Sequence, residues 1–234
     1  MAGSKRLDKF VTECFDLSRS NASRIIRSGA VSVNGNVVKD AGFKTSLGDR
    51  VRLNDVEVEV YDQLYLMINK PAGCVCANED SHNPVVFSYL RQVPGINSCH
   101  CVGRLDLDTT GLLLITSDGQ WSHRISSPKH HLGKTYHATL AEAVTDEQLS
   151  RLREGVLLTG EKKPTTPAIA ERVSEKEIDL TIYEGKYHQV KRMIYAVGNE
   201  VVALSRGAIG SLSLDPELEP GQYRHLRADE IALF

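Results

Sequence analysis

A glycine-bounded loop ahead of an apolar run holds side chains that could do chemistry. Residues 103–111 read GRLDLDTTG, and the run LLLIT follows directly. A loop that leads into a buried strand is a good place for a rigidly held reactive group. Asp106 and Asp108 are therefore candidates for nucleophilic or acid–base work, with Arg104 two positions from Asp106. Asp, Thr and Gly are also ordinary turn residues, so the loop alone leaves the choice open.

Two further segments have the composition of a binding site. Lys134-Thr135-Tyr136 begins a predicted strand, and an aromatic ring at a strand end can stack on a base. Residues 184–193, EGKYHQVKRM, are basic and polar and open a predicted helix. A helix N-terminus with cationic side chains can hold an anion. Taken singly, sheet packing for Tyr136 and a solvated first turn for residues 184–193 explain the same residues.

The elements that must position these segments follow from periodicity and capping. Thr145 to Gln148 forms a capping-box pattern that predicts a helix start. Because strands and helices mix without strict alternation, we predict an α+β fold whose sheet is mostly antiparallel and mixed, flanked by helices. The predicted strands cover 64–68, 112–116, 136–140 and 177–183, and the predicted helices cover 120–125, the segment after 145, and 190–198.

The N-terminal segment reads as a small basic module. Apolar residues at 7, 10, 11 and 14 predict an amphipathic helix, and Ser18 and Gly29 bound a second one. Asn34-Gly35 between valine-rich runs predicts a two-residue hairpin, followed by a strand at 50–53 and a polar linker at 57–63. Residues 1–53 carry ten Lys or Arg and five Asp or Glu, whereas the whole chain carries 28 and 30. This asymmetry favours a polyanion-binding module.

Composition narrows the class of protein. The chain has 234 residues, of which 41% are hydrophobic and 25% charged, and these values exclude disorder, collagen-like fibre and coiled coil. No apolar run approaches the ~18 residues of a membrane span, and the first residues, MAGSKRLD, lack a signal-peptide core. We therefore expect a cytoplasmic protein without a membrane partner. The cysteine pairs at 74/76 and 99/101 lack zinc-site spacing, so free thiols and no metal are expected.

Sequence motifs in the basic module resemble the S4-type RNA-binding domain. The motifs are RLDKF at 6–10, the segment 18–29 and VSVNG at 31–35. The resemblance implies that long cationic side chains contact phosphates, which positions RNA without reading its sequence. The residues so implied are Arg6, Lys9, Arg19, Arg24 and Arg27.

The remaining motifs are similar to those of pseudouridine synthases. KPAG at 70–73, GRLDLDTTGL at 103–112, KTY at 134–136 and GKYHQVKRM at 185–193 match in order and spacing the branch that carries an N-terminal S4 domain. The resemblance covers about residues 5 to 230. It implies an S4-like RNA-binding domain at 1–60 and a catalytic domain at 61–234.

The same resemblance implies roles for single residues. Asp106 matches the essential aspartate, Tyr136 the tyrosine beside the target base, and Lys191 the basic partner of the aspartate. Most branches have Arg at that last position, so the adjacent Arg192 is the alternative partner. Leu204 matches an apolar wall of the uracil pocket. Further residues implied to bind substrate are Arg104, Lys134, His188, Gln189 and Arg192.

The reaction implied is an isomerisation that needs no cofactor, because no atom is gained or lost. A carboxylate can attack C1′, attack C6 of the ring, or act as a base on the sugar, and the sequence leaves these three open. A neighbouring cation would keep Asp106 ionised. The implied substrate is a uridine in small-subunit (16S) ribosomal RNA, naked or in a partly assembled particle, and we expect a monomer. The uridine must leave the stack to reach the carboxylate.

Two alternatives remain at this point. Asp106 and Asp108 could form the acid–base pair of an RNA glycosidic hydrolase. The basic module would equally suit a non-catalytic RNA-binding factor of ribosome assembly. Modified nucleotide indicates the synthase, released uracil the hydrolase, and neither product the binding factor.

Overall fold

The computed structural model describes residues 5–15, 17–127 and 130–234. The chain groups into two compact units. The first comprises Met1–Leu64 with Leu90–His100 and Thr116–Asp118, and the second comprises Tyr65–Tyr89, Cys101–Ile115 and Gly119–Phe234. The predicted S4-like and catalytic boundaries at 60 and 61 remain a prediction.

The first unit contains two short helices, as predicted. They are α1 (Leu7–Cys14) and α2 (Arg19–Ser28). Ser18 caps α2 by accepting a hydrogen bond from the backbone N–H of Asn21 at 3.3 Å. Gly29 ends the helix with a φ of 83°, a left-handed conformation that glycine adopts without a Cβ clash. Local capping therefore fixes both ends of α2.

A four-stranded antiparallel sheet, in the order β3-β2-β5-β6, completes this unit. The predicted hairpin joins β2 to β3, and its turn residues Asn34 and Gly35 have φ values of 51° and 80°. Positive φ at both positions is what a type I′ turn requires. The strands of the unit are β1 (Lys5–Arg6), β2 (Val31–Val33), β3 (Asn36–Val37), β4 (Lys44–Thr45), β5 (Arg50–Leu53) and β6 (Val56–Glu59).

The prediction of a polar linker over 57–63 was wrong at its start. Residues 57–59 belong to β6, where Val58 is buried and pairs with Val51 of β5. The glutamates on either side point the other way, as the two-residue period of a strand demands. The charged residues Glu57 and Glu59 are typical of a linker, and they concealed the alternation of a half-buried strand.

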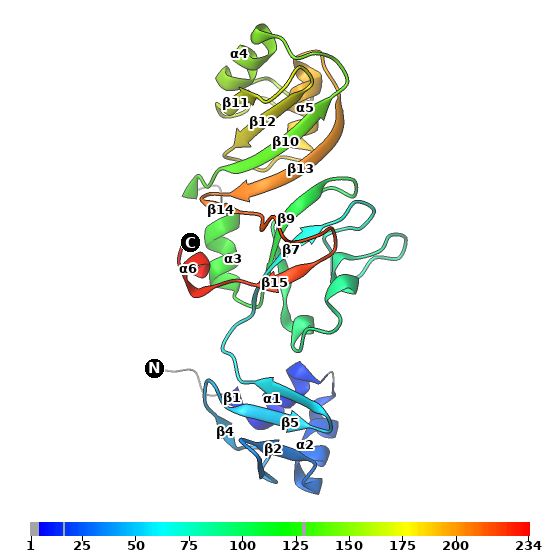
Figure 1. Ribbon diagram of the computed structural model, residues 1–234, viewed down its shortest axis with the longest axis vertical. Helices are drawn as coiled ribbons and strands as arrows, with labels where there is room; N and C mark the ends of the chain where they lie inside the picture. The colour runs from blue at the N-terminus through cyan, green and yellow to red at the C-terminus, as the bar shows by residue number, and fades with distance from the viewer. Residues whose placement is uncertain (1–4, 16, 128–129) are drawn as a thin grey trace. The chain divides into compact units, whose positions relative to one another are not determined.

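The second unit is built on one large mixed sheet (Figure 1). Its order is β11-β12-β10-β13-β9-β7-β15, with β14 beside β13 and β8 beside β9. β13 pairs in parallel with β9, whereas its pairing with β10 is antiparallel, as are β10–β12, β11–β12 and β7–β15. The predicted α+β fold with a mostly antiparallel mixed sheet is confirmed. The strands are β7 (Tyr65–Lys70), β8 (His100–Val102), β9 (Thr110–Thr116), β10 (Lys134–Leu140), β11 (Ile169–Arg172), β12 (Glu177–Ile182), β13 (Val201–Ile209), β14 (Leu212–Ser213) and β15 (Tyr223–His225).

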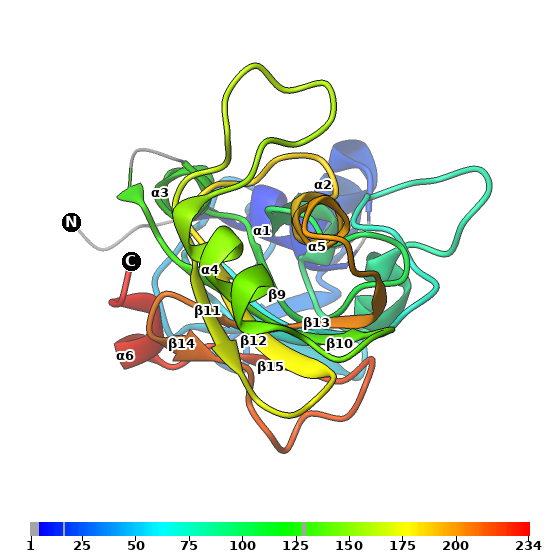
Figure 2. The same ribbon diagram turned by 90° about the horizontal axis from the view of Figure 1, so that it is seen from above.

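Helices cover this sheet. The helices are α3 (Gly119–Ser126), α4 (Asp146–Glu154), α5 (Gln189–Ala196) and α6 (Ala228–Ile231), with a 3₁₀ turn at Val86–Leu90. A further 3₁₀ turn, Ile96–Ser98, belongs to the first unit. Figure 2 shows α4 and α5 on the same face of the strands β10 to β13. The predicted capping box at Thr145 begins α4, and Trp121 of α3 packs into the core with Met67 and Leu112. None of the helices in the described part of the chain is long and apolar enough to cross a membrane.

Candidate active site

Asp106 lies in the loop between β8 and β9 and faces a cavity of about 650 Å³, a size that accommodates a nucleoside. Its side chain is 28% exposed. Four residues later the chain enters β9, and Gly111 has a φ of 98°. A Cβ at Gly111 would overlap the backbone carbonyl oxygen of Arg206 on β13. Glycine thus permits the close approach of β9 and β13 that anchors the loop.

Lys70, the last residue of β7, hydrogen-bonds to the backbone of this loop. Its side chain is fully buried, and its Nζ donates hydrogen bonds to the carbonyl oxygens of Thr109 at 2.8 Å and Asp106 at 3.1 Å. The same nitrogen also lies 3.0 Å from the carbonyl oxygen of Pro71 and 3.4 Å from that of Leu107. A buried ammonium is costly unless its protons are bonded, and here loop carbonyls satisfy it. The bonds fix the backbone that carries Asp106.

A thiol pair supports the same loop from another side. The Sγ of Cys76 accepts a hydrogen bond from the backbone N–H of Leu105 at 3.3 Å. The Cys101 thiol also hydrogen-bonds to Cys76, and this bond lowers the pKa of Cys76 while it raises the pKa of Cys101. All five cysteines lie among the described residues and form no disulfide. No pattern in the sequence predicts that a thiol supports the backbone of the residue before Asp106.

Two side chains from the start of α5 approach the Asp106 carboxylate. The Lys191 Nζ lies 3.7 Å from Asp106 Oδ2, and the His188 Nε2 lies 3.5 Å from Asp106 Oδ1. Lys191 also donates a hydrogen bond to Asp108 Oδ1 at 2.5 Å, and this bond lowers the pKa of Asp108. Lys191 therefore sits between the two carboxylates, and it rather than Arg192 is the cation beside Asp106.

Arg192 points to a different part of the fold. Its Nη2 donates to the carbonyl of Thr159 at 2.7 Å, and its Nη1 donates to the carbonyl of Tyr187 at 3.1 Å. Gln189 is buried and accepts a hydrogen bond from the backbone N–H of Lys186 at 2.8 Å. The two residues fix the turn that leads into α5. Of the pair, only Gln189 lines the cavity.

Strands β10 and β13 supply the opposite wall of the cavity. Tyr136 on β10 is buried and pairs with Arg206 on β13, whose guanidinium carbon lies 6.0 Å from the centroid of the tyrosine ring. Leu204 is buried two residues earlier on β13. Lys134 is half-buried, and burial and then the charge of Arg206 lower its pKa. Exposed Arg104 also lines the cavity.

The predicted site residues of the large unit thus come from four separate parts of the chain. The cavity brings together Arg104, Asp106, Lys134, Tyr136, His188, Gln189, Lys191 and Leu204. Sequence reasoning missed Arg206, which is almost fully buried and donates from Nε to the carbonyl of Leu112 at 2.9 Å. An arginine in an apolar strand was the available signal, but it lay in a segment for which no strand was predicted.

Two family models match this chain. A model of RNA pseudouridylate synthases matches residues 64–196, and an S4 domain model matches residues 5–51. The chain belongs to the RNA pseudouridylate synthase family. It is 48% identical to ribosomal small subunit pseudouridine synthase A of Haemophilus influenzae over 97% of both chains, and 46% identical to that of Escherichia coli over 97% and 98%. A crystal structure of a pseudouridylate synthase matches with a TM-score of 0.71 and 48% identity, covering 97% of this chain and 98% of that one.

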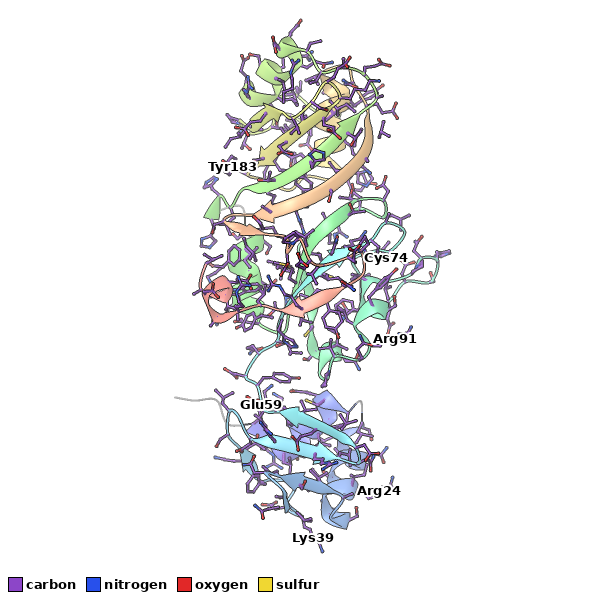
Figure 3. The ribbon with its side chains drawn as sticks, in the orientation of Figure 1. Arg24, Lys39, Glu59, Cys74, Arg91 and Tyr183 are labelled. Atoms are coloured by element: carbon purple, nitrogen blue, oxygen red, sulfur yellow. The ribbon has the colours of Figure 1, made fainter. Side chains whose placement is uncertain are left out.

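In this family member the S4 unit carries exposed cations. Arg19, Arg24 and Arg27 of α2 are exposed and have no carboxylate within ion-pair distance among the residues described. Figure 3 shows Arg24 at the outer edge of its unit. Arg6 and Lys9 instead form ion pairs, to Asp8 at 2.8 Å and Glu13 at 3.8 Å. Three of the five predicted phosphate contacts therefore lie on one helix with no carboxylate partner among the described residues, and Arg24 donates a hydrogen bond to Asn21 Oδ1 at 3.4 Å.

No group of three or more His, Cys, Asp or Glu side chains is arranged to hold a metal ion within residues 5–15, 17–127 and 130–234. The cavity is lined by the acidic residues Asp80, Asp106 and Glu184, by several cationic side chains and by two tyrosines. Such a site can hold an anionic polymer, take up a planar base and present a carboxylate to it.

Proposed function

We propose that this chain isomerises a uridine of small-subunit ribosomal RNA to pseudouridine, with Asp106 as the catalytic carboxylate. The observation that carries the proposal is the setting of Asp106, which faces the nucleoside-sized cavity with Lys191 3.7 Å and His188 3.5 Å from its oxygens. The names of the most similar relatives supply the substrate. Action in the cytoplasm, as a monomer, is part of the same proposal.

RNA binding involves two steps, contact with the phosphate backbone and entry of the target uridine into the cavity. Exposed arginines of α2 contact phosphates and hold the RNA without reading its sequence. The target uridine leaves its stack, which costs a few kcal/mol, and its ring enters the cavity between Tyr136 and Leu204. Stacking on an aromatic ring returns ~1–3 kcal/mol of that cost.

The chemistry breaks the C1′–N1 bond of uridine and forms a C1′–C5 bond. N1 gains a proton and C5 loses one, so atoms and electrons balance without a co-reactant. Asp106 serves this exchange as a nucleophile at C1′ or at C6, or as a base on the sugar. Lys191 places a positive charge 3.7 Å from the Asp106 carboxylate and helps to orient it towards the cavity. Lys70 keeps the loop in the geometry that presents it.

Tritium release tests the proposal. The protein is mixed with small-subunit ribosomal RNA labelled at uridine C5, both naked and partly assembled with ribosomal proteins. Formation of the C1′–C5 bond expels the label into water. We expect release by the wild-type protein without any cofactor, and none by Asp106→Asn. The Asp108→Asn variant is the matched control, because it alters the other carboxylate of the same loop and should retain release.

Other outcomes would contradict the assignment. Release by a folded Asp106→Asn variant would remove Asp106 from the chemistry. Free uracil, lost when either carboxylate is replaced, would indicate a glycosidic hydrolase that uses Asp106 and Asp108 as its acid–base pair. Tight RNA binding with neither product would indicate an RNA-binding assembly factor.

A further inference from the structure

Tyr187 stands out among the residues that line the cavity. It belongs to the turn between β12 and α5, and its side chain is 73% exposed. Its ring stacks on the imidazole of His188, with centroids 3.8 Å apart and planes 19° apart. One ring face is thus occupied by His188, and the exposure of the residue leaves much of the rest open to solvent.

The backbone and the neighbours of Tyr187 fix the plane of this ring. His188 has a φ of 46°, an uncommon left-handed conformation for a residue with a Cβ. The carbonyl of Tyr187 accepts a hydrogen bond from Arg192 at 3.1 Å, and Gln189 bonds the backbone of Lys186 at 2.8 Å. The imidazole under the ring lies in turn 3.5 Å from a carboxylate oxygen of Asp106. The exposed ring is therefore placed by the same contacts that build the site.

We infer that Tyr187 is a stacking platform for a nucleobase that flanks the target uridine. The inference rests on the proposed function and names a second base site beside the first. A rigid aromatic ring loses little conformational freedom when a base stacks on it, and every base offers a π face. The ligand class is therefore an unstacked nucleobase of single-stranded or distorted RNA, accepted with little regard to sequence.

The two tyrosines that line the cavity differ in burial, so each can stack on a different base. Tyr136 is 8% exposed and lies in the wall between two strands, so only a base that has entered the cavity can reach it. Tyr187 is exposed and stacks directly on His188, whose Nε2 lies 3.5 Å from Asp106 Oδ1. A base that remains outside the cavity, next to the flipped uridine, can reach Tyr187.

The chain contains a matched control for this site. Tyr195 is 77% exposed and lies on α5, the helix that follows Tyr187. It does not line the cavity, and it stacks on no ring of the described residues. Replacing Tyr195 removes the same exposed aromatic surface without touching the proposed base site.

Single-turnover tritium release from C5-labelled small-subunit RNA tests the inference. The half-saturating protein concentration and the limiting rate are measured for Tyr187→Leu, Tyr187→Phe and Tyr195→Leu. We expect Tyr187→Leu to raise the half-saturating concentration by about 5- to 150-fold, the equivalent of ~1–3 kcal/mol of lost base stacking. Tyr187→Phe keeps the ring and should stay within about twofold of wild type, as should Tyr195→Leu.

The outcomes separate this inference from the proposed function. If the wild-type protein releases tritium and Tyr187→Leu has the same half-saturating concentration as wild type, the second base site is overturned and the proposed function stands. A loss in Tyr187→Phe as large as in Tyr187→Leu would also overturn it, because stacking needs the ring and not the hydroxyl. No release by the wild-type protein, on naked or assembled RNA, would overturn the proposed function and this inference with it.

Discussion

Replacing Lys70 tests how the loop that carries Asp106 is held in place. The change Lys70→Met removes the ammonium and keeps a side chain of similar length and volume. The carbonyls of Asp106, Leu107 and Thr109 then lose their buried donor. The side chain of Lys70 does not itself line the cavity, so any effect on the reaction passes through the loop.

Opposing terms keep the expected loss of stability small. Hydrogen bonds to a charged group contribute about 1.5–3 kcal/mol each, and at least two good ones disappear. Removing a buried charge returns a desolvation penalty of several kcal/mol. We therefore expect the free energy of unfolding to fall by about 2 kcal/mol, or ~4–8 °C in Tm for a protein of this size.

Lys70→Met should affect kcat for tritium release more than it affects the free energy of unfolding. A loop whose carbonyls lack a donor relaxes, and a displacement of about 1 Å at a reacting group costs ~100-fold in rate. We expect kcat for tritium release to fall by about 100-fold with little change in KM, because the RNA-binding groups are untouched.

The assay pairs tritium release with thermal unfolding and uses Lys176→Met as its control. Lys176 also donates to a backbone carbonyl, that of Ala141 at 2.7 Å, but it is exposed and lies outside the cavity. The control should leave both measurements near wild type. A Lys70→Met variant with wild-type kcat would refute the reasoning, since the loop would then hold its geometry without the ammonium.

Three other predictions follow from the same contacts. Lys191→Met should lower kcat by at least tenfold and Arg192→Met much less, because only Lys191 lies beside Asp106, the proposed catalytic carboxylate; equal losses in tritium release would contradict this. Gly111→Ala should destabilise by several kcal/mol in denaturant unfolding, whereas Gly103→Ala, which also has positive φ but open space, should cost only about 1–2 kcal/mol. A guanidinium hydrogen bond lowers the pKa of Glu230 to about 2, so its stabilisation is complete above pH 4.5 and is lost as the pH falls towards 2; Glu230→Gln should flatten stability curves in that window.

The sequence by itself predicted the caps, the hairpin and most strands, and it singled out the loop at 103–111 as a candidate for the chemistry. Ser18, Gly29 and Asn34-Gly35 act on backbone groups within about four residues of themselves, and caps and turns are decided at that range. The Asp106 loop could also be recognised as a candidate from the sequence, because its glycines and carboxylates and the apolar run after them are contiguous. Its likeness to a known family then supplied the reaction.

Only the tertiary structure decided how the loop is held and which cation faces it. Lys70 reaches carbonyls 36 to 39 residues away, and Arg206 reaches one 94 residues away. Lys191 and Arg192 are chemically similar neighbours, so composition could not separate them. Their directions are set by where α5 meets the sheet, and that depends on the pairing of β13 with β9 and β10. Strand pairing is a contact between distant segments, and no local pattern around residue 191 encodes it.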